Sequence, residues 1–308
     1  MLNRRILRIK AFKELFAIEM TVSPSLAAAS RELDTALEST RDLYLFMLAS
    51  VPALTGVAAA RMEQLSKKIN KTEEERNPNT KFVDNALAAS LAADPDFNKI
   101  IKKKSLSWGA FDLILQQVYA SVQTKDWYAA YMADPERSMA ADCNLFTKIF
   151  EEEFVGNADL DEALENLNIY WNDDLPYALT WCCRSVAAIA KGTPWRMPEL
   201  YLSTGNARMD DDKIFVHKLL QEAFMNYGKY VSAISSSVPN WDKDRLVGTD
   251  IAIVVTALAE IVSFPEIPVN VTINEYVEIS KYFGTPKSSV FVNGILDALS
   301  KKEEFSKR

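Results

Sequence analysis

Apolar residues recur along this chain at helical spacing, three or four positions apart, and stretches that alternate every second residue are scarce. Helices are predicted over residues 3–20, 26–50, 53–69, 82–93, 108–122, 126–132, 136–154, 160–170, 175–190, 211–234, 242–262, 272–284 and 285–299. The polar segment 72–80 and the proline-containing segment 192–208 predict loops. The pattern is typical of an all-α protein.

Residues with end-of-helix preferences mark several of these boundaries. Asn3 is a plausible N-cap for the first helix. Pro52 is expected to separate the second helix from the third, because proline removes a helical hydrogen bond. Thr272 and Glu275 have capping-box spacing, Gly284 marks a helix end, and Thr285 is expected to cap the last helix. The end of the chain is therefore predicted to be two short helices joined by a tight turn.

One uncharged stretch, Leu43–Ala60, has 18 residues, which is at the lower limit for a bilayer span. It contains Pro52 and Gly56, and buried helices explain it better than a membrane span. The basic N-terminus is not a signal peptide, because Glu14 and Glu19 interrupt the apolar segment that one requires. We expect a cytoplasmic protein that does not enter a membrane.

The charge of the chain is unevenly distributed. The 308 residues carry a net charge of −7, yet residues 1–20 hold five Lys/Arg against two Glu. Residues 151–174 hold nine acidic residues and no basic one. Such asymmetry suggests two surfaces for different partners, although solvated helix faces explain the acidic run equally well.

Common catalytic and cofactor motifs are absent. The glycines lie too far apart for a dinucleotide or phosphate loop, and one histidine, His217, cannot form a two-histidine metal motif. Cys143, Cys182 and Cys183 lack zinc-ligand spacing with it, and core positions are the better interpretation. We expect no enzyme activity, no cofactor and no metal.

The first helix carries the clearest candidate chemistry. On a helical wheel, three arginines fall within an arc of about 100°, followed along that arc by aromatic and leucine residues: Arg4, Arg5, Arg8, Phe12, Leu15 and Phe16. A stripe that is first cationic and then apolar suggests that the helix start projects from the protein, where guanidinium groups can bind phosphate oxygens. A solvated, salt-bridged helix start is the alternative.

The sequence resembles the NusB antitermination factors, in particular the long members of Bacteroidetes-type bacteria. Residues 4–16 (RRILRIKAFKELF) resemble the Arg-rich opening of that family. Residues 250–260 (DIAIVVTALAE) and 267–299 resemble its C-terminal helices, with a Lys-x-Phe-Gly turn and a Phe-Val-Asn-Gly ending. A weaker resemblance covers residues 144–161.

The resemblance implies an all-α, NusB-like bundle of two packed helical subdomains with helical insertions. We expect an N-terminal subdomain over residues 1–135, with an insertion near 71–135. A C-terminal subdomain is expected over 136–308, with an insertion at 172–240.

It also implies a function: binding of boxA-type single-stranded RNA in rRNA leaders, jointly with the small-subunit ribosomal protein NusE, in an RNA polymerase antitermination complex. The implied RNA-binding residues are Arg4, Arg5, Arg8, Phe16, Lys281 and Phe283. Asn293 and Gly294 are implied to be structural, as a cap or a close-packed pair. We expect that Arg4→Ala combined with Arg8→Ala weakens RNA binding at unchanged thermal stability.

The sequence also allows other functions. The protein could be a non-catalytic protein–protein scaffold of the transcription or ribosome-assembly machinery, as the acidic middle region suggests. RNA methyltransferases with a NusB-like domain are excluded by the missing Gly-rich loop. A homodimer is possible and would cover the RNA surface.

Overall fold

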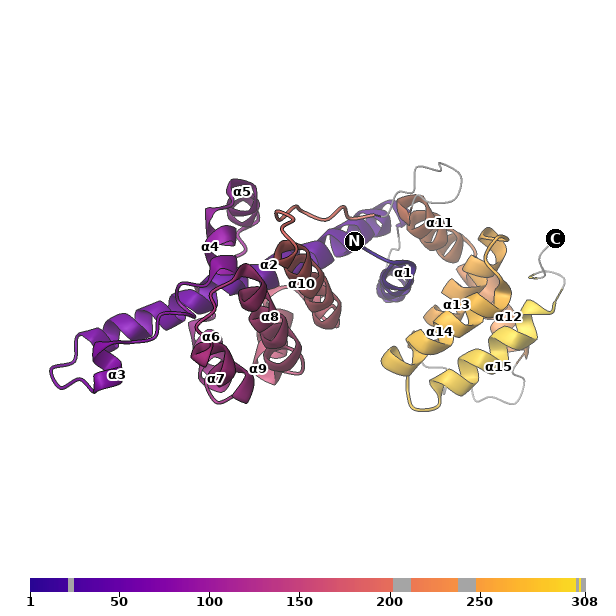
Figure 1. The fold of residues 1–308 in the computed structure, drawn as a ribbon. Coiled ribbons are helices and arrows are strands. Elements are labelled where there is room, and N and C mark those ends of the chain that lie inside the picture. The colour runs from indigo at the N-terminus through magenta and orange to yellow at the C-terminus, as the bar shows by residue number, and fades with distance from the viewer. Residues whose placement is uncertain (22–24, 202–211, 238–247, 303–304, 306–308) are drawn as a thin grey trace. The chain divides into compact units, whose positions relative to one another are not determined.

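The structure, a computed structural model, describes residues 1–21, 25–201, 212–237, 248–302 and 305. Within these residues the regular secondary structure is helical throughout, as Figure 1 shows. The predicted all-α class is confirmed.

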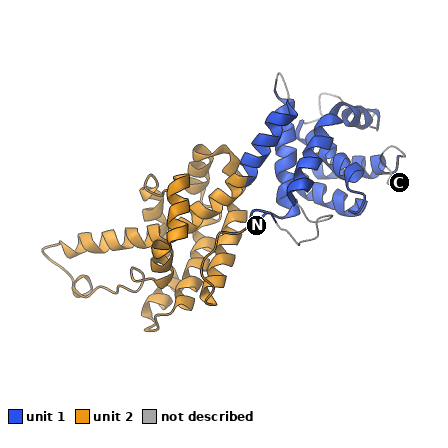
Figure 2. Cartoon of the chain, turned by 90° about the horizontal axis from the view of Figure 1, so that it is seen from above, with its two compact units in different colours: residues 1–37, 199–308 blue, residues 38–198 orange. Residues whose placement is uncertain are grey.

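The chain divides into two compact units, coloured separately in Figure 2. Unit 1 combines residues 1–37 with residues 199–308, and unit 2 is the continuous stretch 38–198. This division differs from the expected one at residue 135. The first boundary falls within one long helix, where the composition gives no sign of it.

Unit 1 is built around one helix that is apolar on all sides. Helix α13 contacts α1, α11, α12, α14 and α15, and it is buried almost along its whole length. Burial on every face is what an all-round apolar sequence requires. The helices of this unit are α1 (Arg4–Glu19), the beginning of α2 (Leu26–Ser66), α11 (Asp212–Met225), α12 (Tyr227–Ser237), α13 (Gly248–Ser263), α14 (Val269–Phe283) and α15 (Ser288–Ser300).

Helix α2 runs without interruption through Pro52, so the predicted break there is wrong. Val51 and Leu54 on either side of the proline are fully buried, and their packing stabilises the helical path despite one missing hydrogen bond. The Ser50 hydroxyl also donates to the Met47 carbonyl oxygen at 2.6 Å. Tertiary packing overrides the local preference of proline here.

By length and composition alone, α2 is the one helix among the described residues that could cross a membrane. Its most apolar 18-residue window has a mean hydropathy of 1.8, and 67% of that window is buried inside the protein. A core helix of a soluble protein has these properties too, so the helix is weak support for a membrane span.

Unit 2 contains the rest of α2 and a bundle of shorter helices around an aromatic core. Phe46 stacks on Trp108 with ring centroids 4.5 Å apart, and Phe82 stacks on Tyr119 at 5.4 Å. The helices are α3 (Glu73–Arg76), α4 (Ala86–Ala93), α5 (Pro95–Lys104), α6 (Asp112–Val122), α7 (Asp126–Ala133), α8 (Met139–Ile149), the π-helix η1 (Phe150–Phe154), α9 (Ala158–Leu167), the 3-10 helix η2 (Ile169–Trp171) and α10 (Leu175–Ala190).

Several predicted helix ends differ from the structure. Asn3 caps α1 as expected. Helix α5 is absent from the predicted helices. The segment 72–80, expected to be a loop, contains α3, which begins with a Thr72–Glu75 capping box. The Thr272–Glu275 spacing does not form a capping box, since α14 begins earlier and the buried Thr272 hydroxyl bonds another helix. Thr285 does not cap α15 either, because that helix follows Lys287.

Candidate nucleic-acid interface

The beginning of α1 does not project from the protein, so that prediction is wrong. Met1 and Leu2 are buried, the Leu2 amide donates to the Leu200 carbonyl oxygen at 2.8 Å, and the Met1 amine donates to the Glu199 carbonyl oxygen. Residues 199 and 200 are distant in sequence, and no local pattern indicates that they cover the helix start.

The Arg8 guanidinium lies inside unit 1. It donates to both carboxylate oxygens of Glu260, at 2.7 and 2.9 Å, and Glu260 has no exposed surface. The same carboxylate accepts hydrogen bonds from Thr272 at 2.8 Å and Tyr276 at 3.2 Å. Burial lowers the pKa of Arg8, but the hydrogen bond and the negative charge of Glu260 outweigh it, so the pKa is raised. The charged Arg8 therefore joins α1 to α13 and α14, and it is shielded from solvent.

Arg5 is paired but remains accessible. Its Nε and Nη2 donate to the Glu275 carboxylate at 2.9 and 2.8 Å, while 49% of its side chain is exposed. The hydrogen bonds from Arg5 lower the pKa of Glu275 despite partial burial, so this carboxylate is charged at neutral pH. One side of the Arg5 guanidinium is thus available to an anion.

Arg4 is less exposed than Arg5. Its Nε lies 2.7 Å from the Asp212 carboxylate, and its guanidinium carbon lies 4.1 Å above the centre of the Phe215 ring. The side chain is 32% exposed. The three arginines therefore form a series from the accessible Arg5 through Arg4 to the enclosed Arg8.

The structure brings the α14–α15 turn against α1. The Phe12 and Phe283 rings lie 5.1 Å apart, and Lys13 Nζ lies 4.9 Å from the centre of the Phe283 ring. Lys281 is exposed and pairs with Glu278 at 2.5 Å. The contact between α1 and α14 thus brings Arg5 against Glu275 and Lys13 against Phe283, and Lys281 lies exposed beside the turn.

Gly284 makes this turn possible through close packing. A Cβ atom on Gly284 would lie 2.4 Å from Ser288 Cβ and 2.7 Å from the Ser280 carbonyl oxygen. Any side chain would therefore clash with the start of α15.

The remaining expected residues have different surroundings. Phe16 is half-buried, and a Cβ atom on Gly248 would lie 3.3 Å from its ring, so it packs where α13 begins. Asn293 and Gly294 are exposed within α15, and a Cβ atom on Gly294 would meet nothing within 4 Å. The expected cap or close packing at these two residues is wrong.

The sequence interpretation missed Tyr282, Lys287 and Val290. All three are exposed around the α14–α15 turn, Tyr282 at 81% and Val290 at 77%. The sequence signal was present, because Tyr282 lies between the Lys281 and Phe283 that were singled out.

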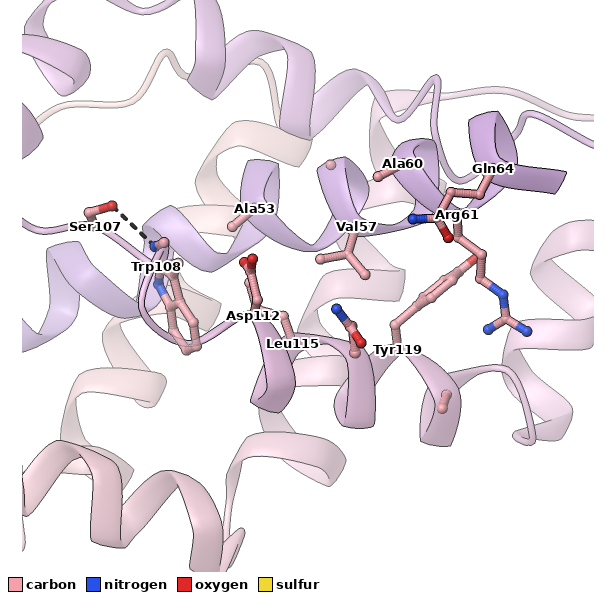
Figure 3. A pocket seen from close by; sticks show the side chains of 14 residues that line it. Ala53, Val57, Ala60, Arg61, Gln64, Ser107, Trp108, Asp112, Leu115 and Tyr119 are labelled. Carbon is pink, nitrogen blue, oxygen red and sulfur yellow. Dashed lines mark hydrogen bonds between the residues drawn. The ribbon is translucent and has the colours of Figure 1, made fainter. Parts of the chain in front are cut away.

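Unit 2 has a groove of about 890 Å³ between the second half of α2 and α6 (Figure 3). Small residues of α2, among them Ala53, Val57 and Ala60, line one side, and Leu115 and Tyr119 of α6 line the other. Its charged lining residues are one arginine, Arg61, and one aspartate, Asp112, so it lacks the positive charge that a phosphate backbone requires.

The described residues offer little for catalysis or metal binding. They contain no group of three or more His, Cys, Asp or Glu side chains that could hold a metal ion. Burial raises the pKa of the Cys143 and Cys183 thiols to about 11, so both are protonated at neutral pH. His217 Nε2 lies 3.0 Å from the Asp34 carboxylate and faces no thiol or hydroxyl nucleophile in the contacts observed.

The described residues thus define an all-helical protein with paired arginines and lysines and aromatic rings on α1 and beside the α14–α15 turn. The family model described as "NusB family" matches residues 190–301, which lie almost wholly in unit 1. The chain belongs to the NusB family.

Several curated relatives are similar to this chain. The transcription antitermination protein NusB of Alkaliphilus oremlandii is 35% identical over 94 residues, 30% of this chain and 68% of that protein. That of Geobacter sulfurreducens is 32% identical over 111 residues, 36% of this chain and 80% of that protein. That of Chloroherpeton thalassium is 37% identical over 86 residues, 28% of this chain and 41% of that protein. No solved structure matches the chain significantly.

Proposed function

We propose that this chain is a non-catalytic, cytoplasmic transcription antitermination factor. It binds boxA-type single-stranded RNA of rRNA leaders together with the small-subunit ribosomal protein NusE, and it helps RNA polymerase to pass terminators. Membership of the NusB family supports the proposal, as do relatives named transcription antitermination protein NusB.

The observation that carries the RNA-binding part is the contact between α1 and the α14–α15 turn. It places Arg5 against Glu275 and Lys13 against Phe283, and the exposed Lys281 lies two residues before Phe283 on the last turn of α14. Guanidinium and ammonium groups bind phosphates, and aromatic rings stack on unpaired bases, so this combination suits single-stranded RNA.

The implied residues divide by role in this proposal. Arg5, Lys281 and Phe283 contact RNA, because each retains exposed surface. Arg4 adds positive charge at the edge. Arg8 and Phe16 act indirectly, since one fixes α1 against α13 and the other packs near the start of α13.

Binding to RNA alone is weak in this proposal. Glu275 and Glu278 accompany Arg5 and Lys281, and each carboxylate competes with a phosphate for its cation. NusE would supply further contacts, which makes the complex tighter than the binary pair.

Fluorescence titration of labelled boxA RNA, with a scrambled RNA as reference and with purified NusE present or absent, tests the proposal. Lys281→Ala weakens binding about threefold to tenfold, and it lowers the slope of log affinity against log salt by about 0.7. Lys301→Ala is the matched control, because Lys301 also pairs with a carboxylate on its own helix, at 2.7 Å, but lies at the far end of α15. Equal affinity for boxA and scrambled RNA, even with NusE, would refute the proposal.

A protein–protein scaffold is the second candidate. The side chains of Asp159, Asp161, Glu162 and Glu165 on α9 form no ion pair within the described part of the chain, and Leu167 and Ile169 beyond them are exposed. A basic protein would fit such a surface. NusE binding without any gain in RNA affinity would favour this candidate, and light scattering during the same titrations would reveal a homodimer.

A further inference from the structure

Tyr282 is the one aromatic residue among the large apolar side chains that the described residues expose. Its side chain is 81% exposed, and it makes no hydrogen bond or ring contact with another described residue. Folding therefore gains little from this ring, and a large exposed apolar side chain beside charged groups is typical of a binding surface.

Near Tyr282 along the chain lie charged and apolar residues, among them Glu278, one helical turn before it and paired with Lys281. Lys281 precedes Tyr282, and Lys287 is exposed just beyond the turn. Val290, on the first turn of α15, is 77% exposed. Lysines thus lie on both sides of Tyr282 along the chain, and Val290 is a second exposed apolar residue near the turn.

The position of the ring is fixed more firmly than its exposure suggests. Its neighbour Phe283 packs on Phe12 of α1, and Gly284 lies against Ser288 with no room for a side chain. The backbone on both sides of the turn is consequently anchored, so Tyr282 would present its ring at a defined place with little loss of backbone freedom.

We propose that Tyr282 stacks on an unpaired base of the bound RNA, while Lys281 and Lys287 contact the phosphates on either side. This inference rests on the function proposed above and adds a stacking residue to that site. A base is the favoured occupant over an apolar protein side chain, because the flanking lysines match a polyanion. Every base has a π-face, so the contact tolerates different sequences.

Three substitutions separate base stacking from a general apolar contact. Tyr282→Phe keeps the ring, Tyr282→Leu keeps apolar surface without a ring, and Leu113→Ala is a control that truncates another exposed apolar side chain, 69% exposed, in unit 2. Because Tyr282 is exposed, all three variants are expected to melt like the parent protein, which circular dichroism checks.

The variants are compared by titrating boxA RNA that carries 2-aminopurine at successive positions, in the presence of NusE. Tyr282→Phe binds like the parent protein, whereas Tyr282→Leu binds about tenfold more weakly. Its salt slope is unchanged, since no charge is removed. At one position the parent and Phe proteins change the 2-aminopurine fluorescence, and the Leu protein does not.

The outcomes distinguish this inference from the function on which it rests. If Tyr282→Leu binds RNA like the parent protein while Lys281→Ala weakens binding, the stacking role is overturned and RNA binding stands. If Tyr282→Leu reduces affinity for NusE in the absence of RNA, the ring contacts protein and the inference is overturned. If the parent protein does not prefer boxA to scrambled RNA, both fail.

Discussion

At the scale of single residues, Arg8 shows what a helical wheel can and cannot predict. The wheel places Arg4, Arg5 and Arg8 on one arc, but it cannot show what faces that arc. The carboxylate that encloses Arg8 belongs to Glu260, 252 positions later in the chain. A candidate ligand-binding cation is thus part of the packing of unit 1, and only Arg5 keeps a side chain that is about half exposed.

Arg8→Met is therefore expected to destabilise the protein by about 3–5 kcal/mol, since it leaves the buried Glu260 carboxyl group without its cationic partner. Arg5→Ala is expected to cost at most about 1 kcal/mol, because that pair is exposed to solvent. Urea unfolding measures both values. This differs from the expectation that removing Arg8 leaves thermal stability unchanged, and equal small losses in the two variants would contradict it.

Glu14 should make stability depend on pH. Burial, and then the negative charge of Glu32, raise the pKa of Glu14 to about 7 from 4.5. The folded state therefore holds a proton that the unfolded state releases, and the contribution of Glu14 to stability falls as pH rises from about 4.5 to about 7. Glu14→Gln should remove this part of the dependence. Thermal melts of both proteins between pH 4.5 and 8 measure it, and parallel curves would contradict it.

At the scale of elements, amphipathic and apolar periods locate helices well, and local end signals locate their ends less well. The periodicity places α10 at the predicted bounds, whereas Thr272 is drawn into a bond with Glu260 and does not cap α14. Short α5 was missed because its lysine-rich sequence buries only Phe97. Where the structure differs from the sequence prediction, contacts between helices determine the helix ends, and local end signals do not.

The two glycines at the end of the chain should respond oppositely to alanine. Gly284→Ala is expected to destabilise the protein by more than about 2 kcal/mol, because the new methyl group would overlap Ser288 and the Ser280 carbonyl. Gly294→Ala is expected to stabilise it by about 0.5–1 kcal/mol, since this helical position is open. Denaturant midpoints measure both, and a loss of stability in Gly294→Ala would contradict the second expectation.

At the scale of the whole molecule, the resemblance located the NusB-like part but not the limits of the inserted unit. Residues 250–299, which carry the clearest resemblance, lie in unit 1. Most of residues 190–301, which the NusB family model matches, lie in unit 1 as well. The predicted insertions at 71–135 and 172–240 divide the chain differently from unit 2, which spans 38–198. Helical periodicity is the same on both sides of residue 37, so sequence could not reveal the boundary.

If the RNA surface lies in unit 1, charge removal in unit 2 should leave RNA binding unchanged. Arg61→Ala, which alters the groove of unit 2, is expected to preserve both boxA affinity and its salt dependence, unlike Lys281→Ala. Titrations at several salt concentrations compare the two variants. A smaller salt slope for Arg61→Ala would show that unit 2 also contacts the phosphate backbone.

The first boundary between the units, at Leu37 and Glu38, lies inside the uninterrupted helix α2. Shortening the chain there would leave freshly cut helical ends, each with up to four amide or carbonyl groups lacking hydrogen-bond partners. Anyone dissecting this protein into pieces should therefore cut before Leu26 and accept residues 26–37 as an overhanging stretch of helix on unit 2, because residues 38–66 include core residues of unit 2 such as Phe46.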